Sequence, residues 1–297
     1  MAFEYKEQHE KSVSQLKKPT RCKVEVPHAE QWTLHSRTNR KYQIFVAKPA
    51  EAAPPSGYPV IYLLDANSVF GTMVEAIRLQ GRRPDKTGVV PAIVVGIGYE
   101  TEGPFADERF YDFTPEPTTE YSHRPDGTVL PEQGGAADFL EFIEEDLKPE
   151  IEGEFSIDRS RQAIFGHSLG GLFVLHVLFT KPKAFQTYIA GSPSIHWNQQ
   201  LLHEKEQQFV SHVKQEPIDV AILLAMGEEE KRHSSGNSHK AKELAERLSA
   251  LSSRGVEVEF REFEGEGHVS VLPVLISRAL RFAFSPEQGE HSIHSSK

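Results

Sequence analysis

Residues 162–179 read QAIFGHSLGGLFVLHVLF, and this stretch decides the fold. Its first four residues form an apolar run of the kind found in strands buried on both faces. From Leu169 onward the segment is apolar all round, which predicts a helix enclosed by the core. Between the two, residues 166–170 match the pattern G-x-S-x-G, whose glycines permit a tight turn that holds the serine in a strained conformation. We therefore expect a sharp turn that presents Ser168; a turn whose serine only caps the helix is the alternative.

Further apolar runs, each bounded by turn residues, lie on both sides of this stretch. They are PVIYLLD (59–65), VPAIVVGIGY (90–99), QTYIAGS (186–192) and DVAILLAMG (219–227). Alternating residues predict an antiparallel strand in KYQIFVAKP (41–49) and a last strand over 255–265. Helical spacing of apolar residues marks 139–147 and 271–284. Strands that alternate with helices predict an α/β fold with a mostly parallel sheet and helices on both faces.

The length of 297 residues allows one large domain or two small ones. The candidate catalytic residues named below span 67–268, so we expect a single domain over 1–284 and a polar tail over 285–297. The stretch 99–135 is rich in proline, glycine and aromatic residues and has no clear periodicity. Because it follows a predicted strand, it is a candidate substrate-covering loop.

Charge and cysteine content narrow the class of protein. The 33 Lys and Arg residues stand against 43 Asp and Glu, a formal net charge of −10 that argues against a nucleic-acid partner. The single cysteine, Cys22, has no internal partner and suits a reducing compartment. The first 18 residues lack the apolar run of a signal peptide, and no later segment approaches the roughly 18 apolar residues of a membrane span. We expect a soluble cytoplasmic protein, and the sequence leaves its oligomeric state open.

A serine hydroxyl becomes a good nucleophile only beside a base, and histidine is the usual one. In an α/β-hydrolase the chain order is serine, acid, histidine, and the histidine follows the last strand. Among the 14 histidines, His268 meets this condition. The acid should follow the preceding strand, where Glu228, Glu229 and Glu230 are candidates; we choose Glu230 because three residues of loop let its carboxylate turn back toward His268. His167, beside the serine, is interpreted as structural.

A tetrahedral intermediate also needs hydrogen-bond donors placed for its oxyanion. One expected donor is the backbone N–H of Leu169, which the turn itself positions. The other is expected from the loop after 59–65, at the backbone N–H of Asn67. The alternative there is a plain turn, in which Asp65 and Asn67 serve only turn chemistry.

Six motifs distributed along the chain occur together in one known family. They are YLLDAN (62–67), RFYDFTP (109–115), FLEFIEEDLKPEIE...FSIDRSRQAIFGHSLGG (139–171), AGSPSIHW (190–197), MGEEE (226–230) and EGHVSVLP (266–273). The chain resembles the esterase-D-type esterases, and within them the branch that hydrolyses trilactone siderophores such as ferric bacillibactin and enterobactin. The resemblance runs from about residue 25 to 284. It implies a serine esterase with Ser168 as nucleophile, His268 as base and Glu230 as acid.

This chemistry needs no metal or organic cofactor, and iron enters only as part of the substrate. Two departures from the family pattern bear on the pocket wall. Ala66 stands where relatives often carry glycine, and His196-Trp197 stands where they often carry paired tryptophans.

A ferric tris-catecholate is anionic, so its esterase needs cations near the nucleophile despite a net charge of −10. We expect Arg82, Arg109 and Arg124 to bind the substrate, and Trp197 to stack on a catechol ring. Each could equally be a surface charge or a packed aromatic. Further candidates are Arg83, Lys231, Arg232 and Phe113.

Three other functions remain open. The first is a general carboxylesterase of the feruloyl or acetyl-sugar type. The second is an S-formylglutathione-type thioester hydrolase, which usually carries methionine after the nucleophile and reactive cysteines, where this chain has Leu169 and a single Cys22. The third is a non-catalytic ligand-binding protein on a hydrolase scaffold.

Overall fold

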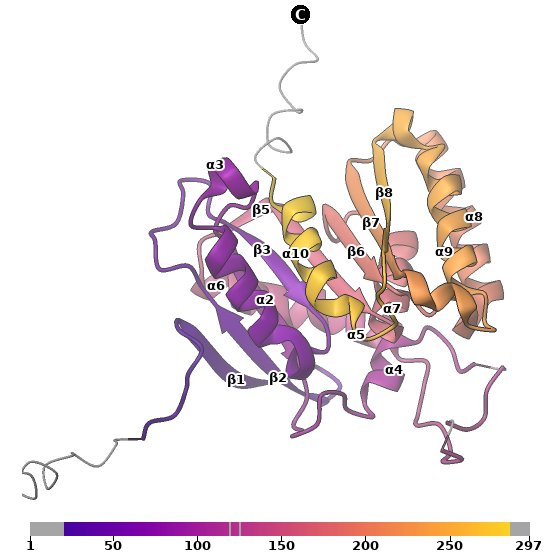
Figure 1. Cartoon of the computed structure of the whole chain (residues 1–297), viewed down its shortest axis with the longest axis horizontal. Coiled ribbons are helices and arrows are strands. Elements are labelled where there is room, and N and C mark those ends of the chain that lie inside the picture. Colours follow the sequence, from indigo (N-terminus) through magenta and orange to yellow (C-terminus); the bar gives the residue numbers. More distant parts are fainter. Residues whose placement is uncertain (1–20, 119, 125, 286–297) are drawn as a thin grey trace, which may run out of the picture.

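The computed structural model describes residues 21–118, 120–124 and 126–285. In this part of the chain, eight strands form one sheet in the order β1-β2-β4-β3-β5-β6-β7-β8 (Figure 1). Strand β2 is antiparallel to both of its neighbours, and every other pair is parallel. The predicted, mostly parallel sheet is confirmed. Its strands are β1 (Ala29–His35), β2 (Lys41–Ala47), β3 (Tyr58–Leu63), β4 (Ile93–Gly98), β5 (Ile157–His167), β6 (Thr187–Gly191), β7 (Val220–Gly227) and β8 (Val256–Phe263).

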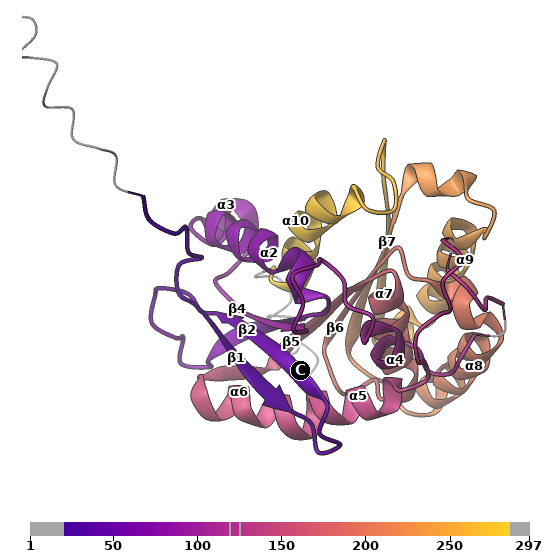
Figure 2. The same cartoon turned by 90° about the horizontal axis from the view of Figure 1, so that it is seen from below.

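Helices cover both faces of this sheet, as Figure 2 shows. Side chains of β3 alternate between the two faces: Ile61 and Leu63 join one apolar cluster, Val60 and Tyr62 the other. The first cluster is closed by α2 (Ala66–Gln80) and α10 (Val271–Ala283). The second is closed by α5 (Ala136–Phe142), a π-helical turn (Ile143–Leu147), α6 (Lys148–Glu154), α7 (Leu169–Thr180), α8 (Gln199–Gln215) and α9 (Asn237–Ser249). Shorter elements are α3 (Pro84–Thr87), α4 (Arg109–Phe113), η2 (Ile195–Asn198), η3 (Glu228–Arg232) and η4 (Ser252–Arg254).

Helix α7 is enclosed on all sides, as its apolar sequence predicts. Every residue of the helix except His176 and Thr180 is buried. Gly171 permits the close approach of α7 to β6, because a Cβ there would stand 2.9 Å from the carbonyl oxygen of Gly191. The start of α7 is thereby fixed against the carboxyl ends of the central strands, where ligands bind in open α/β sheets.

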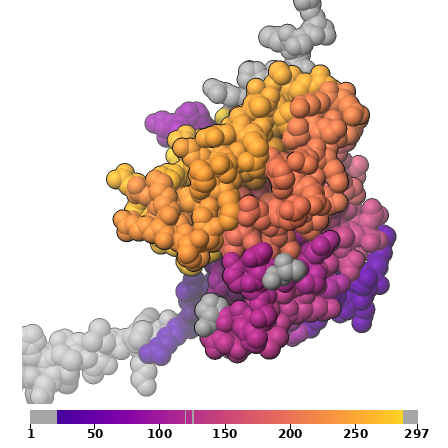
Figure 3. Space-filling view, turned by 90° about the vertical axis from the view of Figure 1, so that its right-hand side faces the viewer, coloured from indigo at the N-terminus to yellow at the C-terminus, as the bar shows by residue number. Residues whose placement is uncertain are grey.

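The segment 99–135 follows β4 and contains α4. Two of its aromatic residues pack against η2: the rings of Phe110 and Tyr121 lie 5.9 and 5.4 Å from the ring of Trp197. Figure 3 shows the segment, in magenta, lying against the orange surface of later parts of the chain. The segment therefore contacts η2 through these rings, and it also contacts the earlier part of the chain, because Arg109 pairs with Asp65 and Asp112 accepts from the hydroxyl of Tyr42.

Within the described ranges, no helix combines the length and the apolar character needed to cross a bilayer. The first 18 residues and residues 286–297, on which the expectations of a missing signal peptide and of a polar tail depend, lie outside these ranges.

Candidate active site

Ser168 lies at the junction of β5 and α7 in the strained conformation that the sequence pattern predicts. Its backbone angles are φ 59° and ψ −117°, and its N–H donates to the carbonyl oxygen of Gly191 at 2.9 Å. The turn depends on Gly166, since a Cβ at that position would stand 2.2 Å from the carbonyl oxygen of Gly170. The side chain of Ser168 is consequently presented just beyond the carboxyl end of β5, a central strand of the sheet.

The loop between β8 and α10 brings His268 to this serine. Nε2 of His268 lies 3.1 Å from Oγ of Ser168, and Nδ1 lies 2.8 Å from Oε2 of Glu230. A carboxylate, an imidazole and a hydroxyl are thus joined in one hydrogen-bonded line, which is the arrangement that allows an imidazole to take a proton from serine.

Glu230, on η3 just after β7, is held by two further donors. Its Oε1 accepts from Oγ of Ser192 at 2.6 Å and from the backbone N–H of Gly227 at 2.8 Å. Burial raises the pKa of Glu230, but the hydrogen bonds from His268, Ser192 and Gly227 outweigh it and hold the pKa below its usual value. The carboxylate is therefore ionised at neutral pH.

The two neighbouring glutamates are engaged elsewhere. Oε2 of Glu228 accepts from the backbone N–H of Gly265 at 3.1 Å, and Glu229 pairs with Arg232 on the surface. Of the three glutamates, the structure brings Glu230 to His268.

The two expected oxyanion donors lie at the starts of two helices. Neither the backbone N–H of Leu169 nor that of Asn67 donates to an acceptor among the described residues. The side chain of Asn67 is committed to Tyr99: Oδ1 accepts from its N–H and Nδ2 donates to its carbonyl oxygen, both at 2.9 Å. This clamp fixes the first turn of α2 to the end of β4, so the backbone N–H of Asn67 is held in place.

Asp65 precedes this turn in a left-handed conformation, with φ 53° and ψ 43°. Its carboxylate receives two hydrogen bonds of 2.8 Å from the guanidinium of Arg109. A Cβ on Gly170 would lie 3.6 Å from Oδ2 of Asp65, so this carboxylate borders the serine turn.

The four expected substrate-binding residues lie in different environments. Arg109 is buried, and its Nε and Nη2 both donate to the carboxylate of Asp65, next to the serine turn. The structure contradicts the prediction for Arg82. This residue follows the end of α2 that lies opposite Asn67. The helix has 15 residues, so at a rise of about 1.5 Å per residue its two ends are about 20 Å apart. Trp197 follows Ser194, whose Oγ lies 3.3 Å from Oγ of Ser168, and Arg124 contacts the ring of Phe110, which packs on Trp197.

Arg124 pairs with Asp107, and its guanidinium carbon lies 5.2 Å from the centre of the Phe110 ring. Trp197 is half-buried, and its indole N–H donates to Gln133 at 3.1 Å. Of the other candidates, Phe113 is buried in the core and Arg83 lies beside Arg82. Lys231 and Arg232 form ion pairs with Glu262 and Glu229, as Arg124 does with Asp107.

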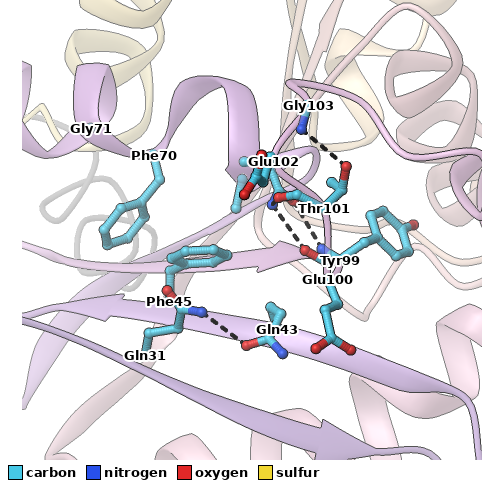
Figure 4. A pocket seen from close by; sticks show the side chains of 12 residues that line it. Gln31, Gln43, Phe45, Phe70, Gly71, Tyr99, Glu100, Thr101, Glu102 and Gly103 are labelled. Carbon is cyan, nitrogen blue, oxygen red and sulfur yellow. Dashed lines mark hydrogen bonds between the residues drawn. The ribbon is translucent and has the colours of Figure 1, made fainter.

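A cavity of about 560 Å³ lies between β1, β2, the first turns of α2 and the residues that follow β4 (Figure 4). Its lining includes Phe45 and Phe70 and the carboxylate-bearing Glu100 and Glu102, together with Asn67. The triad residues do not line it, and its two glutamates do not suit an anionic ligand. Asn67, one of the two expected oxyanion donors, is the residue that connects this cavity to the candidate site.

Several supporting residues were not predicted from the sequence. Ser192 and the Asp65–Arg109 pair act through contacts between segments far apart in the chain, and no local pattern marks such contacts. Oγ of Ser194 lies 3.3 Å from Oγ of Ser168. The motif AGSPS could have indicated this residue, because it places two serines directly after β6.

Comparison with known proteins gives consistent matches over most of the chain. The family model described as "Putative esterase" matches residues 35–272. The chain is 60% identical to the ferri-bacillibactin esterase BesA of Bacillus subtilis (strain 168), covering 90% of this chain and 92% of the relative. It is 34% identical to the siderophore enterobactin esterase of Emericella nidulans, over 84% and 92% of the two chains. The solved structure of the BES protein from Bacillus cereus superposes with a TM-score of 0.83 at 44% identity, over 90% of this chain and 99% of that one.

Proposed function

The chain belongs to the Esterase family, and from this premise we propose that Ser168, His268 and Glu230 are the triad of a serine esterase that hydrolyses trilactone siderophores. The observation that carries the proposal is the hydrogen-bonded line from the carboxylate through the imidazole to the hydroxyl. Identity of 60% to a ferri-bacillibactin esterase and of 34% to an enterobactin esterase supports the substrate class.

The first half of the reaction forms an acyl-enzyme. Oγ of Ser168 attacks the lactone carbonyl carbon while Nε2 of His268 takes the hydroxyl proton. Glu230 accepts the N–H at Nδ1 and stabilises the imidazolium. The backbone N–H groups of Leu169 and Asn67 donate to the oxyanion. When the intermediate collapses, the C–O bond of the lactone breaks and His268 gives the proton to the departing oxygen.

The second half releases the product. Because the lactone is cyclic, the new alcohol stays in the same molecule, and the whole linear trimer remains bound to Ser168 through one ester. Water then attacks this ester with His268 as base, which frees the serine and gives a carboxylic acid. Opening the ring removes the scaffold that holds three iron-binding arms at high effective concentration, so it weakens the chelate. We place this iron release in the cytosol, since a chain with one cysteine suits a reducing compartment.

Arg124 and Trp197 are the proposed contacts for the aromatic arms of the substrate. Two backbone hydrogen bonds connect Trp197 to Ser168. The N–H of Ser194 donates to the carbonyl oxygen of Ser168, and the N–H of Trp197 donates to the carbonyl oxygen of Ser194. Arg124 belongs to the segment 99–135, which packs on Trp197 through Phe110 and Tyr121. A planar cation and an aromatic ring at one rim suit an anionic catecholate.

The proposal is tested by comparing kcat/KM for ferric and iron-free trilactones with that for p-nitrophenyl acetate, a feruloyl ester and S-formylglutathione. A trilactone should give the highest value, and Ser168→Ala should abolish it. If the simple esters are cleaved quickly and both trilactones stay intact, the substrate class is wrong.

A further inference from the structure

We propose that His167 is a positioning residue that holds the backbone of His268 at a fixed distance from the nucleophile, an inference that rests on the proposed triad. The sequence suggested only a structural role for this residue. Its side chain is 6% exposed, yet its polar edge is directed at a single partner: Nε2 lies 2.6 Å from the carbonyl oxygen of His268.

The proposed base needs such a restraint because it lies in a loop. The side chain of His268 is 46% exposed, and the loop joins β8 to α10. The loop is tied to η3, the element that carries the proposed acid, because the N–H of Gly265 donates to Glu228 and the N–H of Glu229 donates to the carbonyl oxygen of Glu266. The bond from His167 ties it to β5, the strand that ends in the nucleophile.

The direction of this hydrogen bond fixes the tautomer of His167. A carbonyl oxygen only accepts hydrogen bonds, so Nε2 of His167 must carry the proton. Burial, followed by the proximity of His268, lowers the pKa of His167 to about 4, and His167 is neutral at pH 7. A neutral donor holds the loop without placing a charge beside the base.

The neutrality matters because the two imidazole rings are close. Their centres lie 4.7 Å apart. In the proposed reaction His268 becomes an imidazolium, and a second positive charge at this distance would oppose that step. Arg109 also disfavours a charge on His167, whereas Glu230 favours one, so burial decides its state. During the proposed reaction only His268, which is hydrogen-bonded to Glu230, carries a positive charge at this pair of imidazoles.

Two variants separate positioning from packing. In His167→Gln, the amide nitrogen takes the place of Nε2 and keeps the donor. His167→Leu keeps similar bulk and loses the donor. Activity is measured with p-nitrophenyl acetate. The concentration of active enzyme is measured by labelling Ser168 with a fluorophosphonate. Misplacement of a catalytic group by about 1 Å can cost about 100-fold in rate. We expect His167→Leu to lose about 10- to 100-fold in kcat with little change in KM, and His167→Gln to recover most of it.

The outcomes are distinguishable. Equal kcat values for the leucine variant and the parent would overturn the inference, as would equal losses in both variants that follow their thermal midpoints. If leucine prevents folding, His167→Phe replaces it with the same expectation, and a phenylalanine variant with full kcat also overturns the inference. Failure of the unaltered protein to label at Ser168 would instead contradict the proposed triad.

Discussion

The carboxylate of Asp65 and the guanidinium of Arg109 form a buried ion pair with two hydrogen bonds, each of 2.8 Å. The pair joins α4 to the left-handed residue that precedes the first turn of α2. Asn67, whose N–H is proposed as an oxyanion donor, follows two residues later. Arg109, predicted to bind substrate, is thus paired with the residue that leads into the turn of Asn67.

Arg109→Met should destabilise the protein strongly, because it leaves the carboxylate of Asp65 buried without its partner. Breaking one half of a buried pair costs about 3–5 kcal/mol. Urea denaturation should show this loss together with a lower kcat. Arg82→Met, at the distant end of α2, is the matched control and should leave both quantities near their original values. A stable and fully active Arg109→Met protein would show that the pair does not support the loop.

The two outer glycines of the serine motif should respond differently to alanine. In Gly166→Ala the Cβ meets the carbonyl group of Gly170 at 2.2 Å, so the backbone has to move, and we expect loss of fold or of activity. In Gly170→Ala the nearest atoms are 3.6 Å away, an ordinary contact, and the variant should remain folded. Thermal midpoints and the rate of p-nitrophenyl acetate hydrolysis check both. The reverse order of severity would contradict the geometry of the turn.

Glu230→Gln should reduce kcat by about 10⁴-fold, since an amide orients the imidazole poorly and cannot stabilise its positive charge. Glu229→Gln is the matched control, because Glu229 is on the surface in a pair with Arg232. Steady-state kinetics on one ester substrate distinguish these two glutamates. A large loss on changing Glu229, with little on changing Glu230, would assign the acid differently.

Asp112 predicts a pH dependence of stability. It is buried in α4, and its oxygens accept from the hydroxyls of Tyr42 and Tyr99 at 3.2 and 2.8 Å. Burial raises its pKa to about 7, although hydrogen bonds from Tyr99 and Tyr42 and the charge of Arg40 lower it. The unfolded carboxyl has a pKa near 3.9. Its contribution to stability is therefore full below about pH 4 and is lost as the pH rises toward 7.

The variant Asp112→Asn resembles the protonated carboxyl and does not titrate. The thermal midpoint of the variant minus that of the parent should rise between about pH 4 and 7 and stay level above about pH 8. Thermal denaturation of both proteins in a series of buffers measures this difference. A difference that stays constant from pH 4 to 8 would contradict the raised pKa of Asp112.

Most of the fold was predictable because each central strand is a short apolar run and because the turn at Ser168 has a strict local requirement for glycine. His268 was predictable from chain order after the last strand. The partners of Arg109 and Arg124 were not, since whether an arginine faces a ligand or a carboxylate depends on segments folded against it. Arg82 was misplaced for a related reason: the sequence did not reveal that α2 carries the chain about 20 Å from Asn67 before Arg82.

The central claim, that Ser168 attacks a trilactone, is tested most directly by mass spectrometry of the acyl-enzyme after acid quenching. Trypsin should release Ser168 in the peptide 162–183, because Lys181 precedes a proline. Ring opening expels no fragment, so we predict that this peptide gains the full mass of one trilactone at Ser168 and that the adduct is absent in Ser168→Ala. Consumption of the trilactone without any adduct on this peptide, or with an adduct on another residue, would contradict the claim.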